Sequence, residues 1–376
     1  MAILLFIITV LINIYLSFRK KNNTLVLVIS IIVLSFLAGY GKSESGDLYY
    51  YRLVYEIHPE NSWEIAYIWV NDFFGNLGVS FELFHTIISA VSIILVINGL
   101  NVFTKNSHLI LSLYSIVFFQ FLAIAIRFSI ACSIVLLGFK YLLDDDRKKN
   151  ILYFVFVALG TLFHTTALFS VLFILVVFNK NIIKSLKRFL LIVNIANVLF
   201  VILMMVVPSI SIYLSRIYIS IASIGSDSFS EMAKNYMSQG YSRSYILYSF
   251  LYLLIYICAY NSYKSVVADE DLQIKLDKMN VICLISMIIM PALVFDRSII
   301  RIQFWGIYIC IALFGIAYEL LTSKNGRVKL FRIELKPKQH LGMIYIVSSI
   351  WFSIMYISGG LGFNIFQFLN NNLLFS

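Results

Sequence analysis

The sequence predicts an all-α protein, a polytopic transmembrane helical bundle that forms a single integral membrane domain over residues 1–376. Apolar residues make up 61% of the chain and the mean hydropathy is +0.90, whereas soluble domains are about 45–50% apolar. Charged residues make up only 13%, which leaves little sequence for a soluble domain. The first apolar run, 2–18, is followed and not preceded by basic residues, so we expect a retained helix rather than a cleaved signal peptide.

Apolar runs separated by polar turns predict about 12 transmembrane helices. A crossing helix needs about 20 mainly apolar residues, with a usual range of about 17–25. The pair 150–163 and 165–179 is short, which allows a kinked or partly inserted arrangement there. The runs lie near 2–18, 24–41, 81–104, 107–122, 124–143, 150–163, 165–179, 189–207, 244–262, 279–295, 298–320 and 341–358. The apolar residues 359–376 fit either a thirteenth helix or an interfacial one.

Basic residues orient these helices, because cytoplasmic loops are enriched in Lys and Arg. When residues 19–21 are placed inside and the runs alternate, 21 of the 29 Lys and Arg residues fall in cytoplasmic segments. Two larger loops, about 42–80 and 208–243, then face outside. The net charge of +10 therefore reflects topology and attraction to anionic membrane lipid, and it gives no reason to expect nucleic acid as a partner.

Arg127 is the one charged residue between Leu109 and Phe139. A guanidinium stays protonated, and a charge at membrane depth costs at least about 2.5–3.5 kcal/mol on insertion scales. A carboxylate, water, backbone carbonyls or an anionic ligand must therefore compensate it. The topology places Arg127 near the outer start of its helix, which favours a phosphate or pyrophosphate site, since a planar guanidinium matches bidentate oxygens. The alternatives are a structural ion pair and a snorkelling side chain.

Two further groups fall at outer helix ends on this map. His164 is the only ionisable side chain besides tyrosine within 151–178. It could act as a general acid, a general base or a hydrogen-bond donor to phosphate. The alternative is a core histidine that is hydrogen-bonded to a backbone carbonyl. Arg297 and Arg301 are four residues apart and share a helix face. An anion between them would relieve their repulsion, and Asp296 would orient one of them. An interfacial cluster facing lipid headgroups is the alternative.

The first outer loop combines carboxylates with aromatic rings. Asp47 is followed closely by Tyr50, and Glu64 follows a tryptophan. Rings stack on the apolar faces of sugars and carboxylates accept hydrogen bonds from hydroxyls, so these residues suit sugar binding; an interfacial aromatic belt with solvated acids is the alternative. In the second outer loop, Arg216 and Arg243 are further candidates for substrate binding. The sequence has no P-loop and no His-Glu-x-x-His motif, so we expect no ATP-driven pump, no metal site and no cofactor.

Five motifs follow one another over most of residues 40–310. The first two are an outer Asp with tyrosines, Asp47 with Tyr50 and Tyr55, and a Glu-x-x-Tyr before Leu-Gly, Glu64–Tyr67 with Leu77-Gly78. The others are an Arg before small residues, Arg127–Ala131, a Phe-His-x-x-Ala-Leu segment, Phe163–Leu168, and the late arginines Arg297 and Arg301. In this order the motifs resemble those of the EpsG-like, Wzy-type polysaccharide polymerases of bacteria. Phe128 departs from the family pattern, which often has Gln after the Arg.

The resemblance implies an enzyme, a glycosyltransferase that joins undecaprenyl-diphosphate-linked oligosaccharide repeats into a surface polysaccharide such as O-antigen or capsule. It would work at the outer face of the bacterial cytoplasmic membrane, with a chain-length regulator and a flippase as expected partners. On this hypothesis Arg127, with Arg297 and Arg301, holds the lipid diphosphate. His164 or one of the two carboxylates, Asp47 or Glu64, then deprotonates the acceptor hydroxyl.

Two other functions remain open from the sequence. A transporter or flippase for a lipid-linked oligosaccharide would also use intramembrane arginines, but it is expected to show two related halves and charges near the membrane midplane. Here the charges cluster toward one face, which favours an enzyme. A membrane acyltransferase acting on glycans would rest mainly on His164 and explains the arginines less well.

Overall fold

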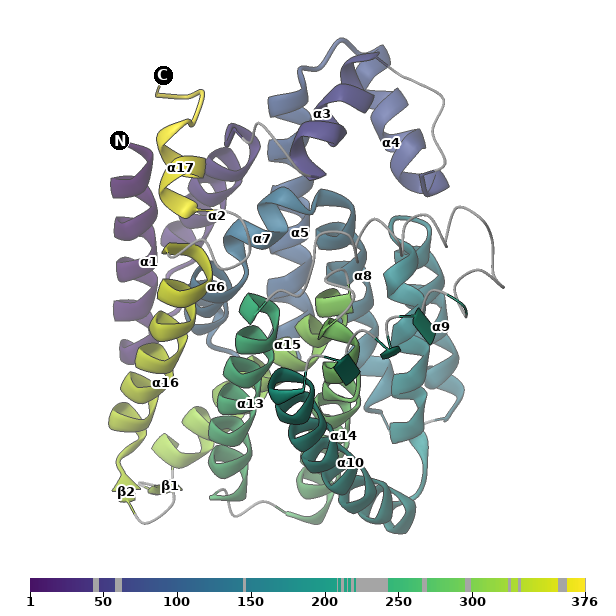
Figure 1. The fold of residues 1–376 in the computed structure, drawn as a ribbon. Helices are drawn as coiled ribbons and strands as arrows, with labels where there is room; N and C mark the ends of the chain where they lie inside the picture. Colours follow the sequence, from purple (N-terminus) through teal and green to yellow (C-terminus); the bar gives the residue numbers. More distant parts are fainter. Residues whose placement is uncertain are drawn as a thin grey trace.

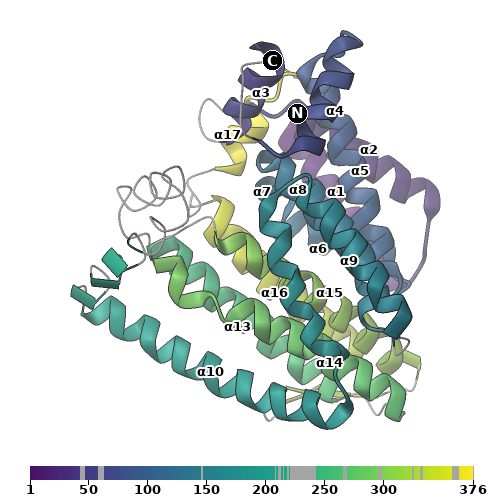
Figure 2. The same cartoon turned by 90° about the vertical axis from the view of Figure 1, so that its right-hand side faces the viewer.

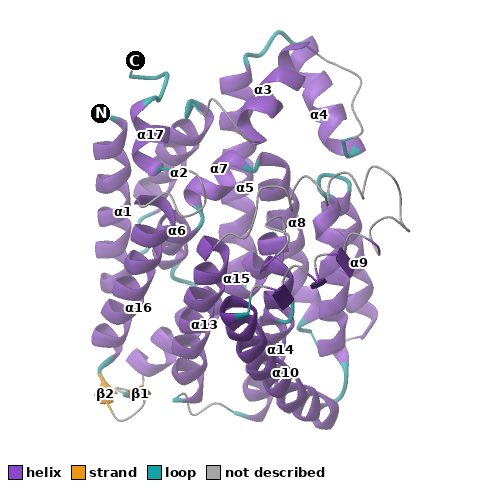
Figure 3. Ribbon diagram, in the orientation of Figure 1, coloured by secondary structure: helices purple, strands orange, loops and turns teal. Residues whose placement is uncertain are grey.

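The computed structural model is almost wholly helical, with most helices side by side in one bundle (Figures 1 and 3). The structure describes residues 1–375 except 43–46, 58–62, 145–146, 208, 211–212, 215, 218–219, 221–242, 266–268, 295–298, 324–325, 331–332 and 358–363. This architecture confirms the predicted all-α class.

The first helices form an antiparallel pair, α1 (Ala2–Arg19) and α2 (Thr24–Gly39). The Asn23 side chain begins α2 by accepting a hydrogen bond from the backbone of Val26, which satisfies one of the unpaired amides of the first turn. Next to α2 lies α5 (Phe81–Asn101). The two backbones approach closely at Gly39, where a Cβ atom would come within 2.7 Å of the Glu82 carbonyl, so only glycine fits this contact.

The predicted helix 107–122 is two helices, α6 (Ser107–Val117) and α7 (Phe119–Ile124), followed by α8 (Ile126–Leu142). The break falls at Phe118, whose φ of −119° leaves the helical range. Its ring stacks on Tyr308 at a centroid distance of 4.1 Å. We attribute the break to this packing, which the apolar pattern of the segment does not reveal.

The short pair of predicted helices consists of α9 (Arg147–Thr161) and a 3₁₀ helix, η1 (Thr165–Val177). The buried side chains of η1 recur every third residue, at Ala167, Ser170, Phe173 and Val176, which is the period of a 3₁₀ helix. At about 2.0 Å per residue, 13 residues reach about 26 Å, compared with about 20 Å for an α-helix. The 3₁₀ winding therefore makes this segment about 6 Å longer than an α-helix of the same number of residues.

Several boundaries differ from the predicted ones because of capping residues. Asn179 begins α10 (Lys180–Val206) nine residues before the predicted start, and Asp269 likewise begins α14 (Glu270–Met287) early.

The remaining elements are α13 (Arg243–Lys264), η2 (Met290–Val294), α15 (Ile300–Ser323), α16 (Pro337–Phe352), the π-helical turn η4 (Ser353–Ile357) and α17 (Ile365–Asn370). With six residues, α17 is far shorter than a crossing helix.

A small antiparallel hairpin of β1 (Val328–Leu330) and β2 (Ile333–Leu335) is a departure from the all-α prediction. Val328 pairs with Leu335 and Leu330 pairs with Ile333. The hairpin lies in a segment that the sequence assigns to a basic cytoplasmic loop, and it is found at the end of the bundle away from α3 and α4 (Figure 1).

The first predicted outer loop contains two helices, α3 (Asp47–Ile57) and α4 (Ile65–Asn76), which together cover one end of the bundle (Figure 1). Tyr55 anchors them: its ring stacks on Phe84 of α5 at 4.8 Å, and its hydroxyl donates to the carbonyl of Val79 at 2.8 Å. The second predicted outer loop, 208–243, lies largely outside the described residues.

Five segments among the described residues are long and apolar enough to cross a membrane, which supports a membrane protein; they are α1, α5, α10, α15 and Glu270–Leu293. The total of about 12 crossings stays a prediction. The crossing window of α15 is 89% buried, whereas that of α10 is 22% buried, and α10 lies along the edge of the bundle (Figure 2). Thus α15 forms the centre and α10 offers the most exposed apolar surface of the five.

Candidate active site

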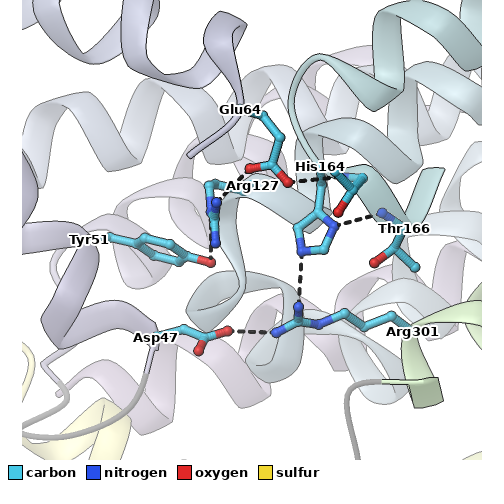
Figure 4. Close-up of polar contacts among 8 residues, drawn as sticks. Asp47, Tyr51, Glu64, Arg127, His164, Thr166 and Arg301 are labelled. Carbon is cyan, nitrogen blue, oxygen red and sulfur yellow. Dashed lines mark hydrogen bonds and ion pairs between the residues drawn. The ribbon is translucent and has the colours of Figure 1, made fainter. Parts of the chain in front are cut away.

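Beneath α3 and α4, ionisable side chains from five separate segments lie close together in two hydrogen-bonded groups (Figure 4). They are Asp47 at the start of α3, Glu64 just before α4, Arg127 in the first turn of α8, His164 just before η1 and Arg301 in the first turn of α15. We call these five residues the polar cluster. All five are residues that the sequence singles out as candidates.

Arg127 is paired with a carboxylate. Its Nη1 lies 2.5 Å from Oε2 of Glu64, and its guanidinium lies over the ring of Trp63 at 4.4 Å and near the hydroxyl of Tyr51 at 3.5 Å. The Arg127 and Glu64 side chains are only 16% and 12% exposed. In this structure Glu64 therefore compensates the charge of Arg127, as the alternative of an ion pair predicts.

Glu64 also ties the outer helices to the bundle. Its second oxygen, Oε1, accepts a hydrogen bond of 2.9 Å from the backbone N–H of Thr165, the first residue of η1. Both carboxylate oxygens are thus engaged, one by a guanidinium and one by a helix end, where negative charge is favoured. Glu64 consequently holds α4, α8 and η1 in a fixed relation around the cluster.

A second ion pair joins Arg301 to Asp47, with 2.7 Å between Nη2 and Oδ2. The other terminal nitrogen of Arg301, Nη1, lies 2.9 Å from Nε2 of His164. The Arg301 side chain is 15% exposed, whereas that of Asp47 is 43% exposed. Asp47 is therefore the carboxylate of the polar cluster that is more open to an incoming molecule.

His164 faces hydrogen-bond donors on both ring nitrogens. The backbone N–H of Thr166 points at Nδ1 over 3.1 Å, and Arg301 lies at Nε2. A neutral imidazole has a single acceptor nitrogen, and neither the backbone amide nor a guanidinium can accept. If Nδ1 carries the ring proton, this N–H faces the N–H of Thr166; if Nε2 carries it, this N–H faces the guanidinium of Arg301. An anionic oxygen between the ring and Arg301 would accept from both and remove this conflict.

Burial lowers the pKa of His164 well below its usual value, and the positive charges of Arg301 and Arg127 lower this pKa further. The imidazole is thus neutral at pH 7. Burial and the charge of Asp47 raise the pKa of Tyr51 above its usual value, so its hydroxyl keeps its proton beside Arg127. Without a ligand, the two guanidiniums and two carboxylates of the polar cluster cancel in charge.

The buried neutral state of His164 predicts a specific pH dependence of stability. The unfolded chain binds a proton at His164 as the pH falls through about 6.5, whereas the folded protein does not, so stability falls as the pH is lowered. We expect His164→Gln to remove about 1 kcal/mol of the destabilisation between pH 6.5 and 5.5. Thermal unfolding midpoints of both purified proteins across this range measure it. Parallel pH profiles for the two proteins would contradict the neutral assignment.

Among the other predicted site residues, the structure describes the side chains of Tyr50 and Arg216, and neither belongs to the polar cluster. Tyr50 is 60% exposed and its ring packs against Tyr49, and Arg216 is exposed on the surface. The side chain of Arg243 lies outside the described residues, as do Asp296 and Arg297.

Two further residues of the site, Tyr51 and Trp63, contact the guanidinium of Arg127. The sequence places both in the aromatic stretches of the first outer loop, which suit sugar binding, but it assigns neither a place beside Arg127. A signal for that place was present in each case. Tyr51 is four residues after Asp47, which puts both on one face of a helix, and Trp63 directly precedes Glu64. Phe128, the departure from the family pattern, packs edge-on against the ring of His164 at 5.8 Å, so it shapes the site through contact and not through hydrogen bonding.

Comparison with known proteins gives one family. The model of the EpsG family matches residues 24–334, a range that includes the whole polar cluster. No curated protein and no solved structure matches the chain. Within the described part of the chain, no group of three or more His, Cys, Asp or Glu side chains could hold a metal ion. With a match over most of its length, the chain belongs to the EpsG family.

Proposed function

We propose that this protein is a polysaccharide polymerase that joins undecaprenyl-diphosphate-linked oligosaccharide repeats at the outer face of the bacterial cytoplasmic membrane. Membership of the EpsG family indicates a membrane protein of polysaccharide synthesis. The observation that carries the finer proposal is the polar cluster: two largely buried arginines, each held by a carboxylate, with a neutral histidine against one of them.

The donor diphosphate is proposed to bind the arginines by exchange with their carboxylate partners. Phosphate oxygens accept bidentate hydrogen bonds from a guanidinium at least as well as a carboxylate does. One such oxygen beside Arg301 would also accept from Nε2–H of His164, which leaves Nδ1 free to accept from Thr166. The first turns of α8 and α15, which carry Arg127 and Arg301, add the positive end of a helix dipole.

In the proposed reaction, the bond between the anomeric carbon of the donor glycan and its diphosphate oxygen breaks. The acceptor hydroxyl of a second lipid-linked repeat forms the new glycosidic bond and gives up its proton. Lipid diphosphate leaves with the electron pair, and Arg127 and Arg301 stabilise its developing charge. Lipid diphosphate is a good leaving group, so the proposal needs no metal or cofactor.

Asp47 is the group that we assign to take the proton. Its half-exposed side chain is held at one oxygen by Arg301, and diphosphate binding at Arg301 would release that oxygen to act as a general base. Glu64 is engaged at both oxygens, which suits a positioning residue. His164, with its lowered pKa, suits a phosphate donor better than a base.

A deletion strain tests this function against its rivals, with surface glycan length measured on a gel. A polymerase predicts loss of the long ladder while single repeats remain on the surface. Complete loss of surface glycan would instead point to a flippase for lipid-linked oligosaccharide. A ladder of normal length that lacks acyl groups would point to an acyltransferase. Cross-linking of the protein in the complemented strain tests the proposed partners, a chain-length regulator and a flippase.

A further inference from the structure

A second site lies at the other end of the bundle from the polar cluster, where α10, α13 and α14 meet. A cavity of about 340 Å³ opens there, within the size range of small-ligand pockets. Residues of all three helices line it. The N-terminal part of α10 and the C-terminal end of α13 lie on the side of the bundle away from α3 and α4 (Figures 1 and 2). The distribution of basic residues predicts that this side faces the cytoplasm.

The described residues that line the cavity include four cations and no carboxylate. From α10 come Lys184, Lys187 and Arg188, and from α13 comes Lys264. Lys187 is neutralised by Asp277, at 2.6 Å. Like charges gathered around one hollow repel one another, so a bound anion would stabilise the arrangement.

The inner wall of the cavity offers an unused hydrogen-bond donor. Asn280 is fully buried, and its Oδ1 accepts from the hydroxyl of Tyr256 at 2.7 Å. Its Nδ2 has no hydrogen-bond partner among the described residues. An unsatisfied buried amide costs about 1–3 kcal/mol, so the site is incomplete without an acceptor.

The surroundings of the cavity are apolar on the side of the membrane. Leu191 and Leu284 line it beyond the cations. The outer face of α10 continues from there with exposed Phe189, Ile192 and Ile195. A ligand with a charged head and an apolar tail fits both the basic cavity and the apolar face of α10, whereas inorganic phosphate would contact only the basic cavity.

We propose that this cavity binds the phosphate headgroup of an anionic phospholipid from the adjacent leaflet. Lys184, Arg188 and Lys264 would surround the phosphate, Nδ2 of Asn280 would donate to one of its oxygens, and the acyl chains would lie along α10. Basic pockets between transmembrane helices on the cytoplasmic side are suited to such headgroups. The site is separate from the proposed polymerase reaction and does not depend on it.

The full-length protein, purified in detergent, tests the proposal through its thermal unfolding midpoint and through native mass spectrometry. Cardiolipin or phosphatidylglycerol is expected to raise the midpoint and to remain bound, whereas phosphatidylcholine at the same mole fraction is not. Lys184→Gln with Arg188→Gln should weaken this effect roughly 30-fold in apparent affinity, at about fivefold for each basic residue near the membrane surface. Lys21→Gln with Lys338→Gln removes the same charge elsewhere and should leave the effect unchanged.

Any of four results would overturn the proposal. The first three are equal responses of the two double variants, an equal effect of phosphatidylcholine, and full reproduction of the shift by sodium phosphate alone, which would assign the cavity to a soluble anion. Preference for farnesyl phosphate over both phospholipids would assign it to a prenyl phosphate carrier and would also overturn it. If the double variant does not give a folded protein, Lys264→Gln is measured in its place, with an expected loss of about fivefold in apparent affinity.

Discussion

Replacing Arg127 with lysine is expected to abolish the long glycan ladder and leave single repeats on the surface. The lysine ammonium keeps the charge but loses the planar fork that binds two oxygens at once and the stacking on Trp63. Removing one donor of this type from a preorganised anion site lowers the rate by about 10²–10³-fold. A deletion strain complemented with the variant measures this on a gel, and Arg127→Ala should give the same result.

A matched control lies at the same end of the molecule. Arg52 pairs with Glu82 at 2.7 Å, and its guanidinium also lies over an aromatic ring, that of Phe81. None of these three residues belongs to the polar cluster. Arg52→Lys should therefore leave the ladder intact at equal protein level. Wild-type ladders in the Arg127→Lys strain would remove Arg127 from the mechanism.

The second large effect is expected for Asp47→Asn. Asparagine keeps the size of the side chain and can still accept a hydrogen bond from Arg301, but it cannot take a proton from the acceptor hydroxyl. Loss of a general base lowers the rate by about 10²–10⁴-fold. With purified protein, the rate of repeat joining at saturating substrate should fall while the binding of the lipid-linked donor is kept.

Two comparisons make this result specific to Asp47. Glu56→Gln neutralises another carboxylate of α3, one whose side chain is 55% exposed and lies 3.6 Å from Arg52, and should leave the rate unchanged. Glu64→Gln is expected to act differently: because Glu64 positions Arg127 and η1, its loss should weaken donor binding as well as lower the rate. A normal rate in Asp47→Asn would assign the base to another group.

The candidate site could be predicted largely from the sequence because its residues are chemically conspicuous. A lone arginine and a lone histidine in apolar runs must each meet a compensating group, which led to Arg127 and His164. Arg301 followed from its position at the outer end of a run, and Asp47 and Glu64 from the aromatic residues beside them in the first outer loop. What the sequence could not supply was the pairing: that Glu64 faces Arg127 and that Asp47 faces Arg301 depends on how α3 and α4 fold back on the bundle.

The predicted fold differs from the structure where packing overrides the apolar pattern. The break at Phe118 depends on Tyr308, which lies 190 residues further along the chain, and hydropathy alone carries no information on such a contact. The 3₁₀ winding of η1 is visible only as the three-residue spacing of its buried side chains. By contrast, the early starts of α10 and α14 follow from the local capping residues Asn179 and Asp269, and the sequence contained this signal.

Purified protein in proteoliposomes, with a synthetic lipid-diphosphate-linked repeat as the only substrate, distinguishes polymerisation from transport. We expect glycans of increasing length, with one lipid diphosphate released for each bond formed, and no growth with Arg127→Lys. Intact single repeats together with movement of the substrate across the bilayer would contradict the proposed polymerase and would identify a transporter.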